Sequence, residues 1–382
     1  MSPLPPSSVG IELSDQQRLA WLRLIRSEKI GAATFIELIK RYGTASDALE
    51  ALPELTARSG SPPMAIASEQ QAMAEMGKIQ RIGGKLVCLG EPDYPAALRA
   101  TDMAPPVLTV RGDKSVLRRH AIAVVGSRNA SLAGIKFTER MVRDIAATSA
   151  NGNPTYVIVS GLARGIDAAA HRASLQSGTI AVFAGGVDHI YPHDHAGLAN
   201  SIVDQGGAVI SEMPFGWQPR AQDFPRRNRI VAGLALGLVV VEAARRSGSL
   251  ISARLANELG RLVFAVPGSP LDPRSEGTND LIKQGAQLIT SASDIAKAID
   301  PIAAVPAQTN YSLDERRQPE MVIETSNQQR QKLLGAMGYT PLTIDDLIRH
   351  TGLSADLVQM IILELDLAGN IERHAGNRVS RI

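Results

Sequence analysis

Short apolar runs alternate with segments of helical spacing between about residues 120 and 300. The runs are rich in β-branched residues and apolar on both faces, and they cover residues 121–125, 156–159, 180–183, 208–210, 238–241 and 262–266. Strands with two apolar faces are typical of parallel sheets that carry helices on both sides. The pattern predicts an α/β fold with an extended, Rossmann-like, doubly wound parallel sheet, to which we assign residues 61–300.

A small helical unit is expected before this sheet. Residues 1–10 are rich in Pro and Ser and are expected to be disordered. Residues 11–60 have helical spacing, with Ser14 as a helix cap and Gly43 as a helix end, and predict a SAM-like or helix-hairpin-like module. The Pro, Ser and Gly residues of 53–63 indicate a linker after it.

The C-terminal part predicts a second small unit. Residues 301–327 are polar and contain three prolines and two glutamines, as expected of a linker. Residues 328–382 show three helical segments, the second capped by Thr343 and the third by Ser354, followed by a hairpin pattern. Three helices and a β-hairpin are the plan of a winged helix.

The composition limits the partners and the compartment. Lys and Arg total 40 against 38 for Asp and Glu, so any contact with nucleic acid must use a local cluster of basic residues. Cys88 is the only cysteine, which excludes a disulfide within the chain and fits a reducing compartment. The longest apolar stretch, residues 230–241, is too short to span a bilayer. We therefore expect a cytoplasmic protein with no membrane partner.

Small residues and arginines follow the predicted strands. In doubly wound sheets, ligands bind outside the carboxyl ends of the strands. Gly-Ser-Arg at 126–128 and Ser-Gly at 160–161 leave backbone amides at strand-to-helix turns, where an anion can bind. Ser249 and Lys283 lie near two further turns. Such turns after several strands predict a rim of anion-binding groups along one edge of the sheet.

The densest basic segment is 220–230, which contains four arginines, Phe224 and Asn228. Unpaired DNA requires fixed positive charge for its backbone and a flat apolar face for its bases. Apolar residues follow this segment directly, so it belongs to the folded core rather than to a tail. We expect at least two of its arginines to be structural, with Asp223 and Glu242 as possible ion-pair partners.

Other motifs have simpler interpretations. Gly126 and Gly134 do not complete a dinucleotide fingerprint, so no cofactor is predicted. His189, His193 and His195 match no zinc spacing, so no metal is predicted. Asp167 is expected to cap a helix, and His171 to pack inside the protein or lie on its surface.

Five motifs together resemble the DNA-processing protein A (DprA/Smf) family. They are Gly-Ser-Arg at 126–128, Ser-Gly-Leu-Ala-Arg-Gly-Ile-Asp at 160–167, Phe-Pro-Arg-Arg-Asn-Arg-Ile at 224–230, Val-Glu-Ala at 241–243 with Ser-Gly-Ser-Leu at 247–250, and Gly-Thr-Asn-Asp-Leu-Ile at 277–282. The resemblance implies binding of single-stranded DNA, homodimerisation through the Rossmann domain, and loading of RecA recombinase in natural transformation. It implies no catalysis.

The resemblance also implies a DNA pocket around Arg128 and residues 224–229. Together with the rim, the candidate DNA-binding residues are Gly126, Ser127, Arg128, Ser160, Gly161, Arg164, Arg220, Phe224, Arg226, Arg227, Asn228, Arg229, Ser249 and Lys283. The third helix of the winged helix carries Asp356, Glu364 and Asp366 but no Lys or Arg. Phosphates would repel it, so we expect it to contact protein or nothing rather than duplex DNA.

Two other functions remain open. Related Rossmann folds are enzymes that cleave a phosphoribosyl group or a nucleotide, and Glu242, at a strand end, could act on a ribose. Against this, we find no nucleophile–base pair in the sequence. An adaptor that acts only through its terminal domains is the third possibility, and it would leave residues 120–300 without DNA binding.

Overall fold

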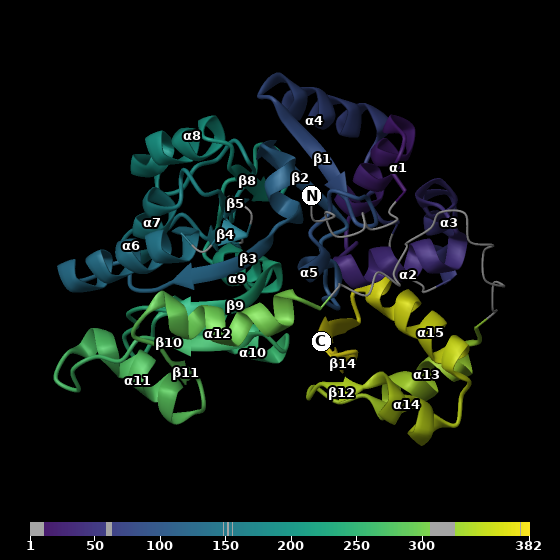
Figure 1. The fold of residues 1–382 in the computed structure, drawn as a ribbon. Coiled ribbons are helices and arrows are strands. Elements are labelled where there is room, and N and C mark those ends of the chain that lie inside the picture. Colours follow the sequence, from purple (N-terminus) through teal and green to yellow (C-terminus); the bar gives the residue numbers. More distant parts are fainter. Residues whose placement is uncertain are drawn as a thin grey trace.

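The computed structural model describes residues 11–58, 63–147, 149–150, 153–154, 156–305, 325–374 and 376–382. A central α/β part is flanked by a helical N-terminal module and a winged helix, and these two small parts lie side by side (Figure 1). The predicted disordered segment 1–10 and most of the predicted linker 301–327 lie outside the described residues.

The central sheet has nine strands. They are β1 (Gly84–Cys88), β2 (Val107–Gly112), β3 (His120–Val125), β6 (Tyr156–Ser160), β7 (Thr179–Val182), β8 (Ala208–Ser211), β9 (Ala235–Val240), β10 (Leu262–Ala265) and β11 (Gln287–Leu288). Their order is β1-β2-β8-β7-β6-β3-β9-β10-β11. The strands from β8 to β11 are all parallel, which confirms the predicted doubly wound core. Strand β2 extends this sheet by pairing antiparallel with both β8 and β1.

Helices cover both faces of the sheet because alternate strand residues point to opposite sides. Ala121, Ala123 and Val125 pack with helices α9 (Asp223–Leu234) and α10 (Gly248–Glu258). Ile122 and Val124 pack with α6 (Leu132–Ala147), α7 (Ile166–Ala173) and α12 (Ala292–Ala303). The remaining elements of this part are α5 (Ala96–Arg99), α8 (Ala196–Asp204), α11 (Glu276–Lys283), and a small hairpin of β4 (Ser149–Ala150) and β5 (Asn153–Pro154).

The N-terminal module begins with three helices, and a fourth packs against them. These are α1 (Asp15–Arg26), α2 (Ala32–Tyr42), α3 (Ala45–Arg58) and α4 (Glu69–Arg81). The Ser14 side chain accepts the Gln17 amide as a cap, and Gly43 ends α2 with φ of 81°. The linker predicted at 53–63 is wrong in its first half, because α3 continues through Pro53 to Arg58. Burial of Leu49, Leu52 and Leu55 along one face outweighs the local effect of the proline.

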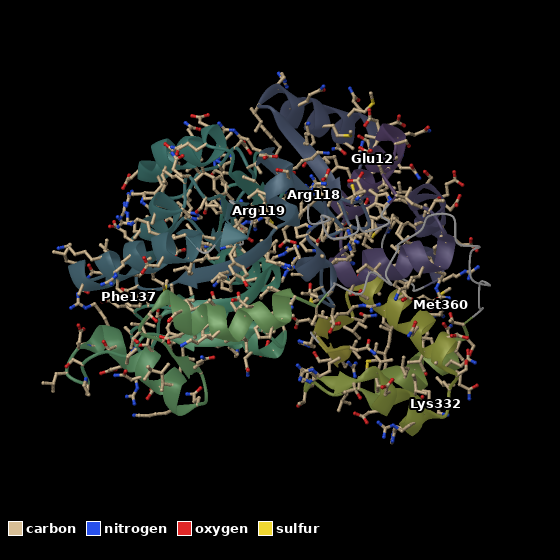
Figure 2. All side chains as sticks on the ribbon, viewed as in Figure 1. Glu12, Arg118, Arg119, Phe137, Lys332 and Met360 are labelled. Carbon is tan, nitrogen blue, oxygen red and sulfur yellow. The ribbon has the colours of Figure 1, made fainter. Side chains whose placement is uncertain are left out.

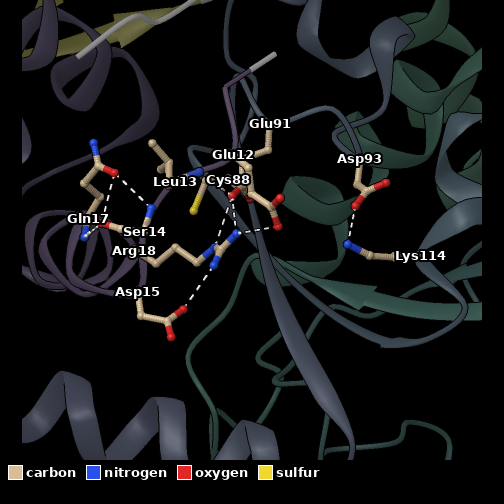
Figure 3. A network of polar contacts seen from close by, with 10 residues as sticks. All are labelled: Glu12, Leu13, Ser14, Asp15, Gln17, Arg18, Cys88, Glu91, Asp93 and Lys114. Carbon is tan, nitrogen blue, oxygen red and sulfur yellow. Dashed lines mark hydrogen bonds and ion pairs between the residues drawn. The ribbon is translucent and has the colours of Figure 1, made fainter. Parts of the chain in front are cut away.

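A buried carboxylate joins the N-terminal module to the sheet (Figure 3). Glu91 accepts hydrogen bonds from the Arg18 guanidinium at 2.7 Å, the Leu13 amide at 3.1 Å and the Cys88 amide at 2.7 Å. Glu91 is 4% exposed, so removal of Arg18 would leave a buried charge poorly compensated. Nearby, Lys114 and Asp93 form an ion pair of 2.5 Å.

The C-terminal unit is a winged helix, as predicted. It contains α13 (Asn327–Ala336), α14 (Ile344–Thr351), α15 (Ala355–Ala368) and a sheet of β12 (Leu342–Thr343), β14 (Arg378–Arg381) and β13 (Ile371–His374). One face of α15 packs on α2 and α3, with Met360 buried at this contact (Figure 2). The Thr34 hydroxyl donates to Asp366 at 2.6 Å. The acidic helix thus contacts protein, one of the two predicted alternatives, and the contacts are with other parts of the same chain. That it does not read duplex DNA stays a prediction.

No helix among the described residues is long and apolar enough to cross a membrane. His171 is fully buried on α7, as one of the two predicted alternatives stated, and its Nδ1 lies 2.7 Å from the Thr179 hydroxyl. Burial lowers the pKa of His171 to about 3, whereas in an unfolded chain it is about 6.5.

The low pKa of His171 predicts a loss of stability in acid. Below pH 6.5 the unfolded chain binds a proton at His171 that the folded protein does not bind. The free energy of unfolding therefore decreases as the pH is lowered. This residue should lower it by about 2 kcal/mol between pH 7 and pH 5. Urea unfolding of His171→Gln should show a pH dependence smaller by that amount. The exposed His350→Gln is the control, and equal pH dependence in both variants would contradict the assignment.

Candidate nucleic-acid interface

Arg128 and the Phe224 segment, far apart in sequence, meet at the carboxyl ends of β3 and β6. Phe224 lies in the first turn of α9 and is half-buried. The Arg128 guanidinium lies 5.7 Å from the centre of its ring. This distance is within the range of a cation–π contact, and Arg128 is itself exposed. The arrangement places a positive charge beside an aromatic ring at the predicted edge of the sheet.

Tyr191 completes this cluster, and we did not predict it. Its ring centre lies 5.3 Å from that of Phe224, with the planes at 60°, and the residue is 50% exposed. An exposed aromatic ring beside another is unusual in a structural role alone. The segment 189–195 was considered only as a metal site. The sequence did contain a signal, because Tyr191 is an aromatic residue in the segment that follows the strand ending at Val182.

A second aromatic–arginine pair lies next to Phe224. The Arg220 guanidinium stacks 4.2 Å from the centre of the Trp217 ring. The buried carboxylate of Asp223 holds both residues, because it accepts the Trp217 indole N–H at 2.9 Å and the Arg220 amide at 2.8 Å. Asp223 is therefore structural, but as a hydrogen-bond acceptor in the turn that precedes α9. We call Arg128, Tyr191, Trp217, Arg220 and Phe224 the strand-end face.

Arg227 does not belong to this face, which corrects its place among the predicted DNA-binding residues. It is 6% exposed, and its Nη1 donates to the carbonyls of Gly161 at 2.5 Å and Val182 at 2.7 Å. Burial lowers the pKa of Arg227 to about 10, and the nearby buried Asp167 partly opposes this shift. Helix α9 directs this side chain inward, so Arg227 joins the ends of β6 and β7 to the helix that carries Phe224.

Ser160 and Gly161 are also structural. The Ser160 hydroxyl is buried and donates to the Val124 carbonyl at 2.6 Å. A Cβ on Gly161 would lie 2.0 Å from Nη1 of Arg227, so only glycine leaves room for the guanidinium. The predicted capping role of Asp167 is wrong, because the N-cap of α7 is Gly165 and no side chain caps this helix. Asp167 lies inside the first turn of α7 and instead accepts the amides of Gly161 and Ala163, in the preceding loop, at 3.2 and 3.3 Å.

The turn at 126–128 is held by close packing. Gly165, with φ of 74°, approaches so near that a Cβ would lie 2.2 Å from the Ser127 carbonyl. The same carbonyl accepts the Ile166 amide at 3.2 Å, and the Ser127 hydroxyl accepts the Asn129 amide at 3.2 Å. A side chain on Gly126 would strike Ile166. These contacts fix the backbone from which Arg128 extends.

The other arginines of the 220–230 segment have structural partners. Arg229 forms an ion pair with Glu212 and donates to the Met103 carbonyl at 2.5 Å. Arg226 is exposed and reaches the same Glu212 carboxylate at 3.2 Å. The predicted partner Asp223 pairs with neither, because the helix turns both guanidinium groups toward Glu212 after β8. Asn228 is half-buried on the same helix.

Three predicted rim residues lie outside the Arg128–Phe224 cluster. Arg164 is exposed after β6 and forms an ion pair of 2.6 Å with Asp194. Ser249 is buried at the start of α10, where its hydroxyl lies 2.7 Å from that of Ser247. Lys283 lies at the C-terminal end of α11 and is a poor candidate, because a helix that follows a parallel strand runs back toward the amino ends of the sheet.

Two further exposed arginines lie at this edge of the sheet and are not among the predicted DNA-binding residues. Arg245 and Arg246 follow β9, which lies beside β3, and precede α10. Neither forms an ion pair with any other residue that the structure describes. Adjacent arginines in a strand-end loop were visible in the sequence, but they lie outside the motifs that we weighed.

Glu242 is not placed to act on a ribose. Its Oε1 accepts the Ser131 hydroxyl at 2.5 Å and its Oε2 accepts the Ser131 amide at 2.9 Å. The residue is 9% exposed, and both oxygens hold the start of α6. It also forms no ion pair with the arginines of α9, contrary to the alternative considered above. Across the described ranges, no group of three or more His, Cys, Asp or Glu residues could hold a metal ion.

The fold and this face define a class: a three-part α/β protein that presents arginines and aromatic rings at the carboxyl ends of a parallel sheet. Residues 85–300 match the family model of DNA recombination-mediator protein A. Residues 15–77 match the DprA-like N-terminal HHH domain, and residues 317–377 the DprA winged helix domain. The chain belongs to the DNA recombination-mediator protein A (DprA/Smf) family.

Named relatives agree with this placement. Protein Smf of Escherichia coli (strain K12) is 42% identical over 292 residues, which cover 75% of this chain and 74% of the relative. The X-ray structure of DNA processing protein A from Streptococcus pneumoniae has a TM-score of 0.60 at 34% identity, covering 75% of this chain and 98% of that one. The Helicobacter pylori protein, whose structure is described for its single-stranded DNA binding mode, has a TM-score of 0.51 at 28% identity, covering 57% and 96%.

The contact between Arg227 and Gly161 yields a stability prediction. In Gly161→Ala the new methyl group displaces the guanidinium, and overpacking of this kind costs about 1–3 kcal/mol. Urea unfolding should show this loss. Gly197→Ala on α8 is the control, because its Cβ would meet nothing within 4 Å and should change stability by less than about 1 kcal/mol. Equal stability of the two variants would show that Arg227 has room to move.

Proposed function

We propose that this protein binds single-stranded DNA on the strand-end face and loads RecA recombinase onto it during recombination or natural transformation. The observation that carries the proposal is the contact of Arg128 and Tyr191 with the Phe224 ring. Family membership supports the proposed role in recombination, since the description of the family names a mediator of recombination. We place this activity in the cytoplasm.

The chemistry of the face suits an unpaired strand. Stacking of one base on an aromatic ring contributes about 1–3 kcal/mol and tolerates any sequence. The rings of Phe224, Tyr191 and Trp217 provide surfaces for bases, and Arg128 and Arg220 provide charge for phosphates. Double-stranded DNA hides its base faces, so these rings would contribute little to binding it.

The proposed action is binding rather than catalysis. The strongest enzymatic candidate, Glu242, uses both carboxylate oxygens in structural hydrogen bonds. Arg227 on α9 and Asp167 on α7 are both buried behind the face, where they support it. Held phosphates and stacked bases would keep a strand extended for a recombinase.

We further propose a homodimer formed through the Rossmann part. Strand β11 is the last strand of the sheet, and both of its residues are exposed. Leu288 on this strand is 48% exposed, and Leu271, in the loop that follows β10, is 93% exposed. An unpaired edge strand with an exposed leucine can pair with a second copy. This edge is several strands away from β6 and β7, so dimerisation would leave the strand-end face open.

The first test of this function replaces the ring and the charge separately. Phe224→Ala should weaken binding of a dT oligonucleotide by about 1–3 kcal/mol, which is about 5- to 150-fold in Kd. Arg128→Ala should flatten the plot of log affinity against log salt by about 0.7. Fluorescence anisotropy measures both, with the exposed Arg140→Ala on α6 as the control. Wild-type affinity in Phe224→Ala would remove the face from the DNA site.

The dimer can be tested apart from DNA binding. Leu288→Asp places a charge on the exposed edge strand and should convert the dimer to a monomer, as measured by sedimentation velocity. Met73→Asp, at an exposed position on α4, should leave the mass unchanged. A dimer that persists in Leu288→Asp would place the interface elsewhere.

A further inference from the structure

A cleft of about 690 Å³ lies where the three parts of the chain meet. Helix α2 forms one wall, the segment 99–104 after α5 forms another, and the winged helix closes the third side with α15 and β14. These elements are neighbours in Figure 1. None of the lining residues belongs to the strand-end face, so this is a second site, and the proposed function does not use it.

One part of the cleft is apolar. Its side chains come from α2, from the loop before β2, and from α14, α15 and β14 of the winged helix. Ile36 and Met103 are partly exposed, and the buried side chains that back them are Ile39, Ile344, Ile362 and Val379. Flat apolar groups such as nucleobases bind to surfaces of this kind. The cleft volume also falls within the range of about 300–1,000 Å³ that is typical of small-molecule sites.

Cationic side chains outnumber carboxylates in the lining of the cleft. Four cationic side chains, Lys40, Arg99, Arg373 and Arg378, face two carboxylates, Glu37 and Asp102. Glu37 is already engaged by the buried Arg41, whose Nη2 lies 3.3 Å away. The cleft therefore holds more positive than negative charge.

Lys40 and Arg99 carry most of this excess. Lys40 is exposed and has no ion pair in the described part of the chain. Arg99 is half-buried, and its Nη2 donates only to the carbonyls of Glu91 at 2.7 Å and Tyr94 at 3.3 Å. Burial lowers the pKa of Arg99, as expected for a cation without a carboxylate partner. An anion bound here would relieve that cost.

The other two cations already interact with other groups of the chain. Arg373 donates its Nε to Asp366 at 2.8 Å, so its charge is shared with the contact between α15 and α2. Arg378 is exposed on β14, at the mouth formed by the winged helix. Gln359 and Asn377 add amide groups that can hydrogen-bond the edge of a base.

We propose that this cleft binds a nucleotide, with the base against the apolar wall and the phosphates beside Lys40 and Arg99. The nucleotide is either free or the terminal unit of a DNA strand, since the recognising chemistry is the same. A nucleotide in this position contacts both the N-terminal module and the winged helix. It would therefore stabilise the docked arrangement of the two.

Titration calorimetry of the full chain with ATP tests the free-nucleotide source. Lys40→Glu removes the unpaired charge, and Ala100→Trp fills the cleft from an exposed position without changing charge. Both should weaken ATP binding by about tenfold or more, the value of one charged hydrogen bond. Lys332→Glu, at an exposed position on the far side of the winged helix (Figure 2), and Phe224→Ala should bind ATP normally.

The strand source is tested with a 5′-phosphorylated dT oligonucleotide in the same variants. If ATP does not bind but Lys40→Glu and Ala100→Trp both weaken oligonucleotide binding, the ligand is a nucleotide of the strand. The proposal is overturned if neither variant affects either ligand, or if Phe224→Ala alone abolishes ATP binding. Because Phe224→Ala reports separately on the strand-end face, failure of either site is distinguishable from failure of the other.

Discussion

The buried guanidinium of Arg227 is the interaction on which the strand-end face depends. It bridges the carbonyls of Gly161 and Val182, which end two neighbouring parallel strands, from a helix that starts beyond both. A buried cation is costly unless oxygen atoms surround it, and here two carbonyls and the nearby Asp167 supply them. Helix α9 is thereby held against the sheet edge, and its first turn presents Phe224 beside Arg128.

The geometry of helix α9 places its arginines in different environments. Successive residues of an α-helix point about 100° apart, so a run of like residues cannot share one environment. Arg227 points into the protein, Arg229 is drawn to Glu212, and Arg226 remains exposed with a longer contact to the same carboxylate. The charge that the DNA strand would meet comes instead from Arg128 and Arg220, which stand beside aromatic rings.

The flanking parts are joined to the sheet and to each other by buried polar contacts. Glu91 receives Arg18 and two backbone amides at the base of the N-terminal module. Asp366 receives Thr34 and Arg373 where the winged helix meets α2. The acidic helix α15, which has the position of a recognition helix, thus directs Glu364 and Asp366 to protein groups, whereas Asp356 is exposed. These contacts with protein groups agree with the negative charge of α15, which phosphates would repel.

The sequence by itself determined the class of the fold and the family, and it predicted the strand ends as the place for a ligand. Those features depend on local patterns, namely the spacing of apolar residues, the residue types at turns, and motifs that are contiguous along the chain. Only the tertiary structure decided which of the predicted residues are exposed. Arg227, Ser160 and Gly161 are interior, and Tyr191 and Trp217 join the face, because burial depends on what packs from distant segments. The cleft between α2 and the winged helix had no sequence signal for the same reason: its walls come from three separate parts of the chain.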